Sequence, residues 1–547
     1  MEDINKKLAK AAPGKAVSEG TQYPTVELEP AELRGVAQAL KDAGFDYLIS
    51  LTGMDYGDAL GTIYHIASTD DPANVVVLKT KTTDRENPML YSIMDIYESA
   101  NLYEREVYDF FGIKFIGHND LRRIFLRPDW NGFPFRKDDK SENSTPTRNI
   151  TAEEMEEMPQ ITIGEDGKIK QSSKMLFGKN EYVVNFGPQH PATHGVLHLR
   201  VSLDGEIVKK IDPNFGYIHR GIEKMAESLT YPQVLPYTDR LDYLSGAINR
   251  HAFCLCVEKA AGIEVPMRAQ IVRCIFDELT RVASHLLGWG CMAMDMGAIT
   301  AFVYGMRDRE KIMDIFEESA GGRLMPAYAV IGGLSQDIHP NFKNRVTEYI
   351  AYQRKMLKEH HILFTGNPIA TGRMHKNGYL TKEKAIALGT GGPTGRASGW
   401  SCDVRKIEPY SAYKEIEFNE IIRNKDTKTG DTFDRYIIRL DEIEESLNII
   451  EKLLVKLDDT KEGDFKAKVP AIIKLPAGDY FQRVENARGE FDVFISSDGN
   501  KNPYRVKFRS PCMTLISALD PICKDGKIAD MIMIGASLDY VIPCADR

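Results

Sequence analysis

The chain changes pattern at a polar stretch that runs from about Arg136 to Lys174. Such a composition is typical of a tether or of a segment that wraps a surface. Because 547 residues exceed what one ordinary core holds, we predict a domain over 1–135, a charged linker over 136–178 and a second domain over 179–547. Acidic and basic residues concentrate in the runs Lys137–Ser144, Glu153–Glu157 and Gly164–Lys168.

The first domain alternates short strand-like runs with helical ones. An amphipathic helix is expected over 30–43, and another helix over 92–111 with Gly112 as its stop. The pattern predicts an α+β domain, a class of fold that carries many functions. The strand-like runs are 25–28, 47–51, 62–67 and 75–80.

The second domain shows long helical periodicity. Apolar residues recur at helical spacing from Leu241 to Leu255 and again from Ile271 to Leu286, and Pro266 opens the second run. Further on, Phe491–Ile495 and Tyr504–Phe508 flank a turn-rich segment and predict a hairpin. This domain is therefore expected to be mainly α-helical with a small β-sheet.

Charge and hydropathy exclude some classes of function. The net charge is −9, and lysine and arginine are interleaved with acids instead of forming a basic patch, so nucleic acid is not an expected partner. No run of about 18 apolar residues occurs, and the first residues have no apolar signal core. We expect a chain that neither spans a membrane nor is exported, so any membrane role is peripheral.

The eight cysteines argue against a metal site in this chain. All lie after residue 253, and no two have the C-x-x-C spacing that iron–sulfur and nickel sites use. Cys254 and Cys256 are two apart, so on a helix they point about 200° from each other. Buried structural thiols are the expectation.

A glycine-rich run at 389–395 invites a nucleotide-binding interpretation, which the residues do not support. The run lacks G-K-[ST], and Thr394 breaks the G-x-G-x-x-G pattern. Pro393 also removes one backbone N–H that a phosphate cradle would use. This run is therefore not expected to bind a nucleotide.

Several longer motifs are more specific. Tyr103–Ile124 (YEREVYDFFGIKFIGHNDLRRI) and Phe133–Asp138 (FPFRKD) closely resemble the signature of the C subunit of respiratory NADH:quinone oxidoreductase, complex I. Other motifs resemble the D subunit of the same enzyme, in the order of the fused C/D form of some bacteria. They are GPQHPATHGV at 187–196, YTDRLDYLS at 237–245, SHL at 284–286, RASG at 396–399 and DVRK at 403–406.

The D subunit is itself similar to the large subunit of nickel–iron hydrogenases, which implies a hydrogenase-large-subunit-like fold for the second domain. Ala487–Gly489 and Ser537–Asp539 stand where that kinship would place them. A hydrogenase needs two C-x-x-C pairs to hold nickel, but none lies near Asp242, and at the C-terminal end only Cys544 is present. The hydrogenase alternative is therefore rejected.

The resemblance implies a peripheral-arm subunit that forms a quinone-reduction chamber next to a terminal [4Fe-4S] cluster on the partner B subunit, coupled to proton translocation. It places FMN, NADH and the clusters on partner subunits, with no cofactor on this chain alone. Membrane subunits would stand at the quinone entrance. The implied location is the cytoplasmic face of the bacterial inner membrane.

The resemblance also assigns site residues. His194 and Tyr243 match the family's two quinone headgroup ligands, and Asp295 matches the carboxylate that pairs with the histidine. Their chemistry fits, because quinone reduction takes two electrons and two protons and needs donors at both carbonyl oxygens. The neighbours of Asp295 are apolar, so a buried acid there needs a partner.

Each of the three has a structural alternative. His194 could be a turn residue bonded to backbone, and Tyr243 a core tyrosine with a satisfied hydroxyl. Asp295 could cap a helix that starts at Met296.

Three further positions bear on the partner's cluster and the chamber wall. Arg240 precedes Tyr243 by three residues, which predicts one shared helix face. The family places this arginine beside the cluster, whereas the alternative is a salt bridge with a neighbouring aspartate. Arg281 and His285 would support the wall or form a solvated pair.

Two departures from the family pattern stand out. Met325 replaces a histidine that makes the cluster potential depend on pH, and methionine takes up no proton. We therefore predict a lower, nearly pH-independent cluster potential, which would suit a quinone such as menaquinone. The final segment 539–547 lacks the proline that relatives carry after the aspartate and contains Cys544 instead.

Two alternatives to this function stay open. One is the same role in a ferredoxin-driven relative of the complex, and the other is a non-catalytic scaffold. The sequence leaves open the quinone type, the electron donor, the pumped ion, the coupling mechanism and the role of the N-terminal domain beyond docking.

Overall fold

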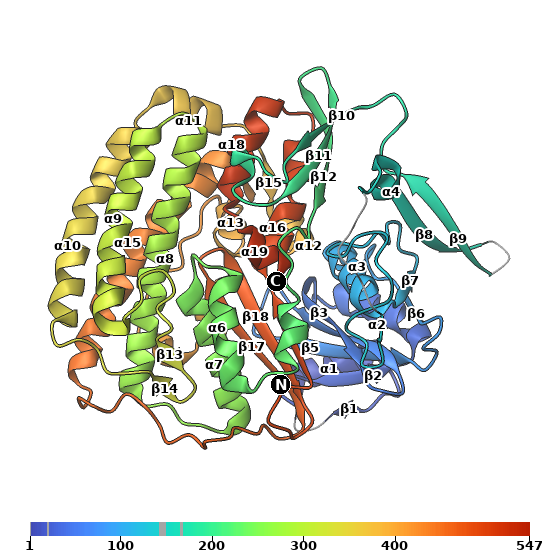
Figure 1. The fold of residues 1–547 in the computed structure, drawn as a ribbon, viewed down its shortest axis with the longest axis horizontal. Coiled ribbons are helices and arrows are strands. Elements are labelled where there is room, and N and C mark those ends of the chain that lie inside the picture. The colour runs from blue at the N-terminus through green and yellow to red at the C-terminus, as the bar shows by residue number, and fades with distance from the viewer. Residues whose placement is uncertain (1, 19–20, 142–148, 165–167) are drawn as a thin grey trace.

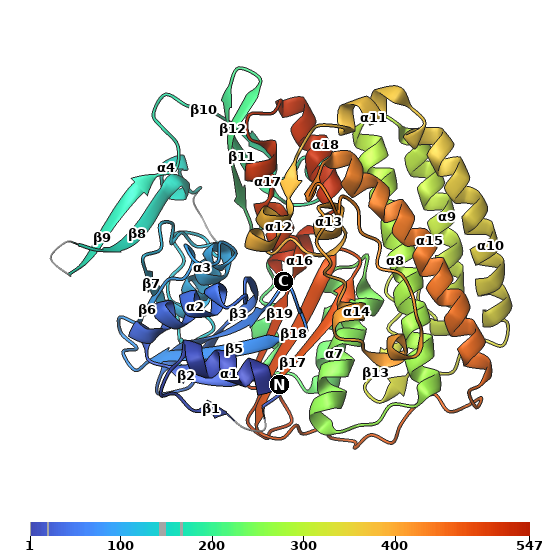
Figure 2. The same ribbon diagram turned by 180° about the vertical axis from the view of Figure 1, so that it is seen from behind.

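The computed structural model describes residues 2–18, 21–141, 149–164 and 168–547. Parts of two charged runs singled out above, 142–144 and 165–167, lie outside this range. A smaller domain with a mixed sheet packs beside a larger domain rich in long helices, and a β-hairpin projects from the segment between them (Figures 1 and 2).

The N-terminal domain is built on a five-stranded sheet of order β1-β2-β5-β4-β3. β2 pairs in parallel with β5, whereas the other neighbours are antiparallel. The four predicted strands are confirmed, and the expected helix over 30–43 appears as a short 3-10 turn followed by α2 (Leu33–Asp42). The sheet strands are β1 (Val17–Ser18), β2 (Thr25–Leu28), β3 (Tyr47–Asp55), β4 (Leu60–Ala67) and β5 (Val75–Thr82), with α1 (Glu2–Ala11) beside them.

The helix expected over 92–111 begins late, so that prediction was wrong at its start. α3 spans Ala100–Phe111 and ends at Gly112, whose φ of 73° is the left-handed cap conformation. The carboxylate of Glu104 explains the late start, because it accepts hydrogen bonds from the Ser92 hydroxyl (2.6 Å) and the Ile93 amide (2.8 Å). The segment before the helix is thereby held outside it, between β6 (Met89–Tyr91) and Ala100.

The charged linker contains regular structure that its composition did not predict. Thr151 caps the short helix α4 (Ala152–Glu156), and β8 (Glu157–Ile163) pairs with β9 (Ile169–Met175) in an antiparallel hairpin. The Gly117 amide, just after β7 (Lys114–Ile116), donates to the Ile161 carbonyl at 2.7 Å. The hairpin is therefore anchored to the N-terminal domain.

The C-terminal domain is a helical body, and its described residues also form two three-stranded sheets. The helix expected from Leu241 to Leu255 is instead two helices, α6 (Tyr231–Leu241) and α7 (Gly246–Ala261), because the turn 242–245 leaves the helical path. α8 (Met267–Asp295) begins after Pro266, in agreement with the second predicted run. The other main elements are β10 (Tyr182–Phe186), β11 (His198–Asp204), β12 (Ile207–Asn214), α9 (Ile299–Ala320), α10 (Phe342–His360), α11 (Pro368–Met374), α12 (Lys382–Leu388), α13 (Gly392–Ala397), α15 (Thr432–Asp458) and α18 (Ile528–Leu538).

The predicted hairpin near the C-terminal end is confirmed and forms part of the contact between the domains. β18 (Gly489–Ser497) pairs with β17 (Gly478–Asn486) and β19 (Arg505–Arg509). Tyr47 donates to Glu490 at 2.8 Å, and Arg509 donates to the Tyr103 hydroxyl at 3.1 Å, across the domain boundary. These buried, long-range bonds fix one domain on the other.

Among the described residues, no helix combines the length and the apolar composition needed to cross a bilayer.

Candidate functional site

His194 lies in a tight loop that follows β10. The hydroxyl of Thr193 donates to the carbonyls of His190 and Gly195 at 2.8 Å each, and His194 itself has a φ of 52°. A left-handed conformation at a residue with a side chain is uncommon and needs such local support. The Thr193 bonds supply this support for the loop that carries the imidazole.

The imidazole pairs with a carboxylate 101 positions further along the chain. His194 Nε2 lies 2.7 Å from Asp295 Oδ2, and the Asp295 side chain is nearly buried. Burial acts to lower the pKa of His194, but the contact with Asp295, the charge of Asp295 and the charge of Asp539 outweigh it, so the pKa is raised. His194 therefore holds a proton more readily than a free histidine does.

Asp295 does not cap a helix starting at Met296, so that alternative is wrong. It is the last residue of α8, and the next helix begins only at Ile299. Its carboxylate is free to face the loop that carries His194.

Tyr243 lies in the turn between α6 and α7 and is half-buried. The idea that it shares a helix face with Arg240 was wrong, because α6 ends at Leu241 and Asp242 takes an extended conformation. Burial raises the pKa of Tyr243, and nearby acids including Asp539 add to this, whereas Arg488 opposes it. The phenol thus stays protonated and can donate a hydrogen bond.

One carboxylate acts on both predicted quinone ligands. The charge of Asp539 raises the pKa of His194 and of Tyr243, and it also acts on Cys291, one turn before Asp295 on α8. Burial and these acids raise the pKa of Cys291 to about 12. Asp539 and Cys291 were not singled out for the site from the sequence, because nothing in their local patterns points to His194 or Tyr243.

Arg240 lies at the surface, and its side chain is 54% exposed. It donates to the carbonyl of Pro236 at 2.6 Å, and Asp239 stands 3.8 Å away, as the salt-bridge alternative suggested. Met325 is half-buried in the loop after α9. Neither residue touches the pair formed by His194 and Asp295 in any contact the structure records.

Arg281 and His285 are fully buried, so their interpretation as a solvated pair was wrong. Arg281 donates to the carbonyls of Glu485 (2.7 Å) and Asn486 (3.1 Å), and His285 Nε2 lies 3.0 Å from Glu442. Both residues belong to the helical core next to the end of β17.

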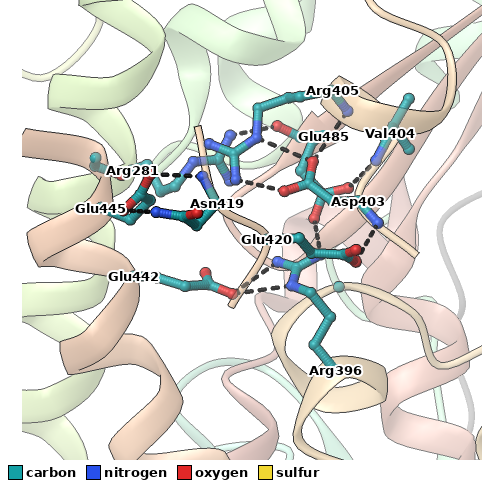
Figure 3. Close-up of polar contacts among 12 residues, drawn as sticks. Arg281, Arg396, Asp403, Val404, Arg405, Asn419, Glu420, Glu442, Glu445 and Glu485 are labelled. Carbon is teal, nitrogen blue, oxygen red and sulfur yellow. Dashed lines mark hydrogen bonds and ion pairs between the residues drawn. The ribbon is translucent and has the colours of Figure 1, made fainter. Parts of the chain in front are cut away.

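Arg281 lies in a buried ionic network (Figure 3), and His285 joins this network through Glu442. Arg396 bridges Glu442 (2.8 Å) and Glu485 (2.7 Å), and Arg405 pairs with Asp403 at 2.7 Å. Burial raises the pKa of Glu485 to about 7, helped by Asp403 and opposed by Arg396. The motifs RASG and DVRK thus supply the paired charges of the core.

The glycine-rich run serves close packing. A Cβ at Gly392 would lie 2.3 Å from the Cα of Gly489, and Gly392 has a φ of 64°. This approach joins α13 to the turn between β17 and β18.

The structure brings two distant cysteines together. Cys512 and Cys544 are buried and both contact the Ser510 hydroxyl: the Cys512 amide donates to it at 3.0 Å, and Cys544 Sγ lies 2.9 Å from it. Across the described residues, no group of three or more histidine, cysteine or acidic side chains is arranged to hold a metal ion.

Comparisons with known proteins place both domains. Residues 26–145 match the family model of the respiratory-chain NADH dehydrogenase 30 Kd subunit, and residues 295–547 match that of the 49 Kd subunit. Similar relatives include the C/D subunit of the NADH-quinone oxidoreductase of Phocaeicola vulgatus, 53% identical over 92% of this chain and 95% of the relative.

Two further relatives support the same assignment. The C/D subunit of Bacteroides thetaiotaomicron is 53% identical over 92% of this chain and 95% of its own length. The D subunit of Desulforamulus reducens is 44% identical over 67% of this chain and 99% of its own length. With a 30 Kd-like domain followed by a 49 Kd-like domain, the chain belongs to the family of fused C/D subunits of NADH-quinone oxidoreductase.

Proposed function

We propose that this chain is a peripheral-arm subunit of an NADH:quinone oxidoreductase and forms one wall of the chamber in which quinone is reduced. The partner B subunit, with a terminal [4Fe-4S] cluster, forms the opposite wall beside Arg240. FMN and the NADH site belong to other peripheral-arm subunits, and membrane subunits surround the quinone entrance. The assembly lies on the cytoplasmic face of the inner membrane.

The observation that carries this proposal is the 2.7 Å contact between His194 and Asp295. A buried carboxylate that raises the pKa of an imidazole keeps a proton available near neutral pH. The phenol of Tyr243, whose pKa is also raised, is a second donor in the same electrostatic environment. Two donors match the two carbonyl oxygens of a quinone headgroup.

In this function, the partner's cluster would supply two electrons one at a time, and quinone would also take up two protons and leave as quinol. His194 gives its proton to one carbonyl oxygen and Tyr243 gives its hydroxyl proton to the other, and protons from water then restore both side chains. The loss of the imidazolium charge leaves Asp295 without its cation. This change of charge is the local event that would couple quinone reduction to proton translocation.

The domain limits proposed for this role are 1–135 for the domain like the C subunit, 136–178 for the linker and 179–547 for the domain like the D subunit. The last is proposed to have the fold of a nickel–iron hydrogenase large subunit without its metal.

The test uses membranes that contain the assembled complex. His194→Ala and Tyr243→Phe are expected to lower quinone reduction while NADH oxidation by an artificial acceptor is unchanged. His375→Ala is the matched control, because His375 also faces a carboxylate, Asp431 at 3.6 Å, but is half exposed. Unchanged quinone reduction in both site variants would favour the scaffold alternative.

The subunits that bring electrons into the complex distinguish the ferredoxin-driven alternative from the NADH-driven one. Purification of the complex through this chain, followed by identification of the bound subunits, shows whether an NADH-oxidising subunit is present. Its absence would favour a different electron donor.

A further inference from the structure

The guanidinium of Arg488 joins three separate segments. Its Nη1 donates to the two carboxylate oxygens of Asp242 at 3.0 and 3.2 Å and to the Ser245 hydroxyl at 3.2 Å. Its Nη2 donates to Asp539 at 3.4 Å. The side chain is fully buried, so these charge-assisted bonds are made without competition from solvent.

The backbone that carries Arg488 is itself held in place. The amide of Arg488 donates to the Asn486 side chain at 3.0 Å, and Asn486 in turn donates to Asn249 of α7 at 2.9 Å. Arg281 holds the carbonyls of Glu485 and Asn486 from α8, the helix that ends at Asp295. The backbone just before Arg488 is therefore fixed, in part by Arg281 of the ionic network in Figure 3.

Both ends of the turn that carries Tyr243 are hydrogen-bonded to the side chain of Arg488. Asp242 directly precedes Tyr243, and Ser245 immediately precedes the first residue of α7. Asp242 also accepts from the Leu244 amide at 3.2 Å. The direction of the phenol therefore depends on where Arg488 places the turn.

The second terminal nitrogen of Arg488, Nη2, contacts Asp539 in the C-terminal segment, which packs against the loop of His194. Asp539 has a φ of 58° and is followed three residues later by Ile542. A Cβ placed on Gly195, next to His194, would lie 2.9 Å from Ile542 Cγ1. The C-terminal segment thus lies directly against the histidine loop.

We propose that Arg488 is a positioning residue for quinone reduction, whose forked guanidinium sets the Tyr243 turn and the C-terminal segment behind His194 at a fixed spacing. The inference rests on the proposed function of Tyr243 and His194. It adds a residue that touches neither quinone ligand and acts through Asp242 and Asp539.

The proposed role depends on the forked shape of the guanidinium, which lets one side chain bind two carboxylates. A lysine in the same place keeps the positive charge but offers a single ammonium, which cannot hold Asp242 and Asp539 in the same geometry. Arg488→Lys therefore changes position while it preserves the charge that acts on Tyr243. Arg354→Lys is the matched control, because Arg354 also forks between acids, Glu444 and Glu451, but lies at the surface of α10.

The experiment is a double-mutant cycle in membranes with the assembled complex. Arg488→Lys is expected to lower kcat for quinone reduction by about 10- to 100-fold, with NADH oxidation by an artificial acceptor unchanged. In a Tyr243→Phe background the same substitution is expected to cost several-fold less, because only its effect through the C-terminal segment behind His194 remains.

Three results would overturn the inference in distinguishable ways. Wild-type kcat in Arg488→Lys, or an equal loss in both backgrounds, refutes the positioning role alone. Wild-type kcat in Tyr243→Phe refutes the proposed function and this inference with it. If Arg488→Lys does not assemble, Asp242→Asn is scored by the same criteria, since it loosens only the contact beside Tyr243.

Discussion

His194 Nε2 lies 2.7 Å from Asp295 Oδ2, which joins a loop at the start of the helical domain to the last residue of α8. In this contact each residue supplies the charge that the other needs. A nearly buried carboxylate needs a cation, and a histidine that is to supply a proton near neutral pH needs an acid.

Asp295→Asn is expected to shift the pH dependence of quinone reduction. Asp295 raises the pKa of His194, so the protonated imidazole persists to higher pH in the wild type. Removing the charge lowers this pKa, and the alkaline limb of kcat against pH should move to lower pH. A pH–rate profile measured with quinone and with an artificial acceptor checks this, and an unmoved limb would count against His194 as the proton donor.

Tyr243→Phe is expected to lower kcat for quinone reduction by about 100-fold, the lower end of the range for loss of a general acid. The substitution removes one hydroxyl from a half-buried ring, so assembly should be retained. Tyr379→Phe, on an exposed tyrosine, serves as the control and should keep the wild-type rate. Equal rates in the two variants would remove Tyr243 from the mechanism.

Met325→His is expected to make the partner's terminal cluster sensitive to pH. Methionine has no proton to exchange, whereas a histidine there would be protonated when the cluster is reduced. The wild-type midpoint potential should be nearly constant between about pH 6 and 8, and the variant should approach a slope of about 59 mV per pH unit. A one-proton slope already in the wild type, seen by redox titration with spectroscopic detection, would refute the prediction.

Glu442→Gln is expected to destabilise the chain by about 3–5 kcal/mol, because it leaves the buried Arg396 with one carboxylate fewer. The control is Glu444→Gln on the same helix, which lies at the surface beside Arg354 and should cost less than about 1 kcal/mol. Denaturant unfolding of the full chain measures both values.

The pH dependence of that loss has a defined sign. Arg396 and His285 hold the pKa of Glu442 below its ordinary value, against burial, which would raise it. The stabilisation is therefore present above the unfolded-state pKa of about 4.3 and is lost as pH falls. The difference between wild type and Glu442→Gln should shrink in acid, and a constant difference would contradict the pairing.

Local patterns predicted those parts of the fold that local physics decides. The strands of the first domain and the hairpin at β18 and β19 could be predicted because their alternation and turn residues are contiguous. The late start of α3 could not, since it depends on the Glu104 side chain reaching back to Ser92 and Ile93. The break at Asp242 likewise depends on Arg488, 246 positions away.

The candidate site likewise has residues that the sequence could predict and residues that it could not. Motif resemblance could name His194, Tyr243 and Asp295, although they are far apart in the sequence. Asp539 and Arg488 were placed only by kinship with hydrogenases, and their contacts with the site arise from packing of the C-terminal segment. No spacing in the sequence encodes that packing.

The most direct test of the central claim is the density of the intact complex with quinone bound. We expect the two carbonyl oxygens of the headgroup within hydrogen-bonding distance of His194 and Tyr243, with Asp295 still beside the imidazole. A headgroup bound elsewhere, or a closed surface between these residues and the bilayer, would contradict the account.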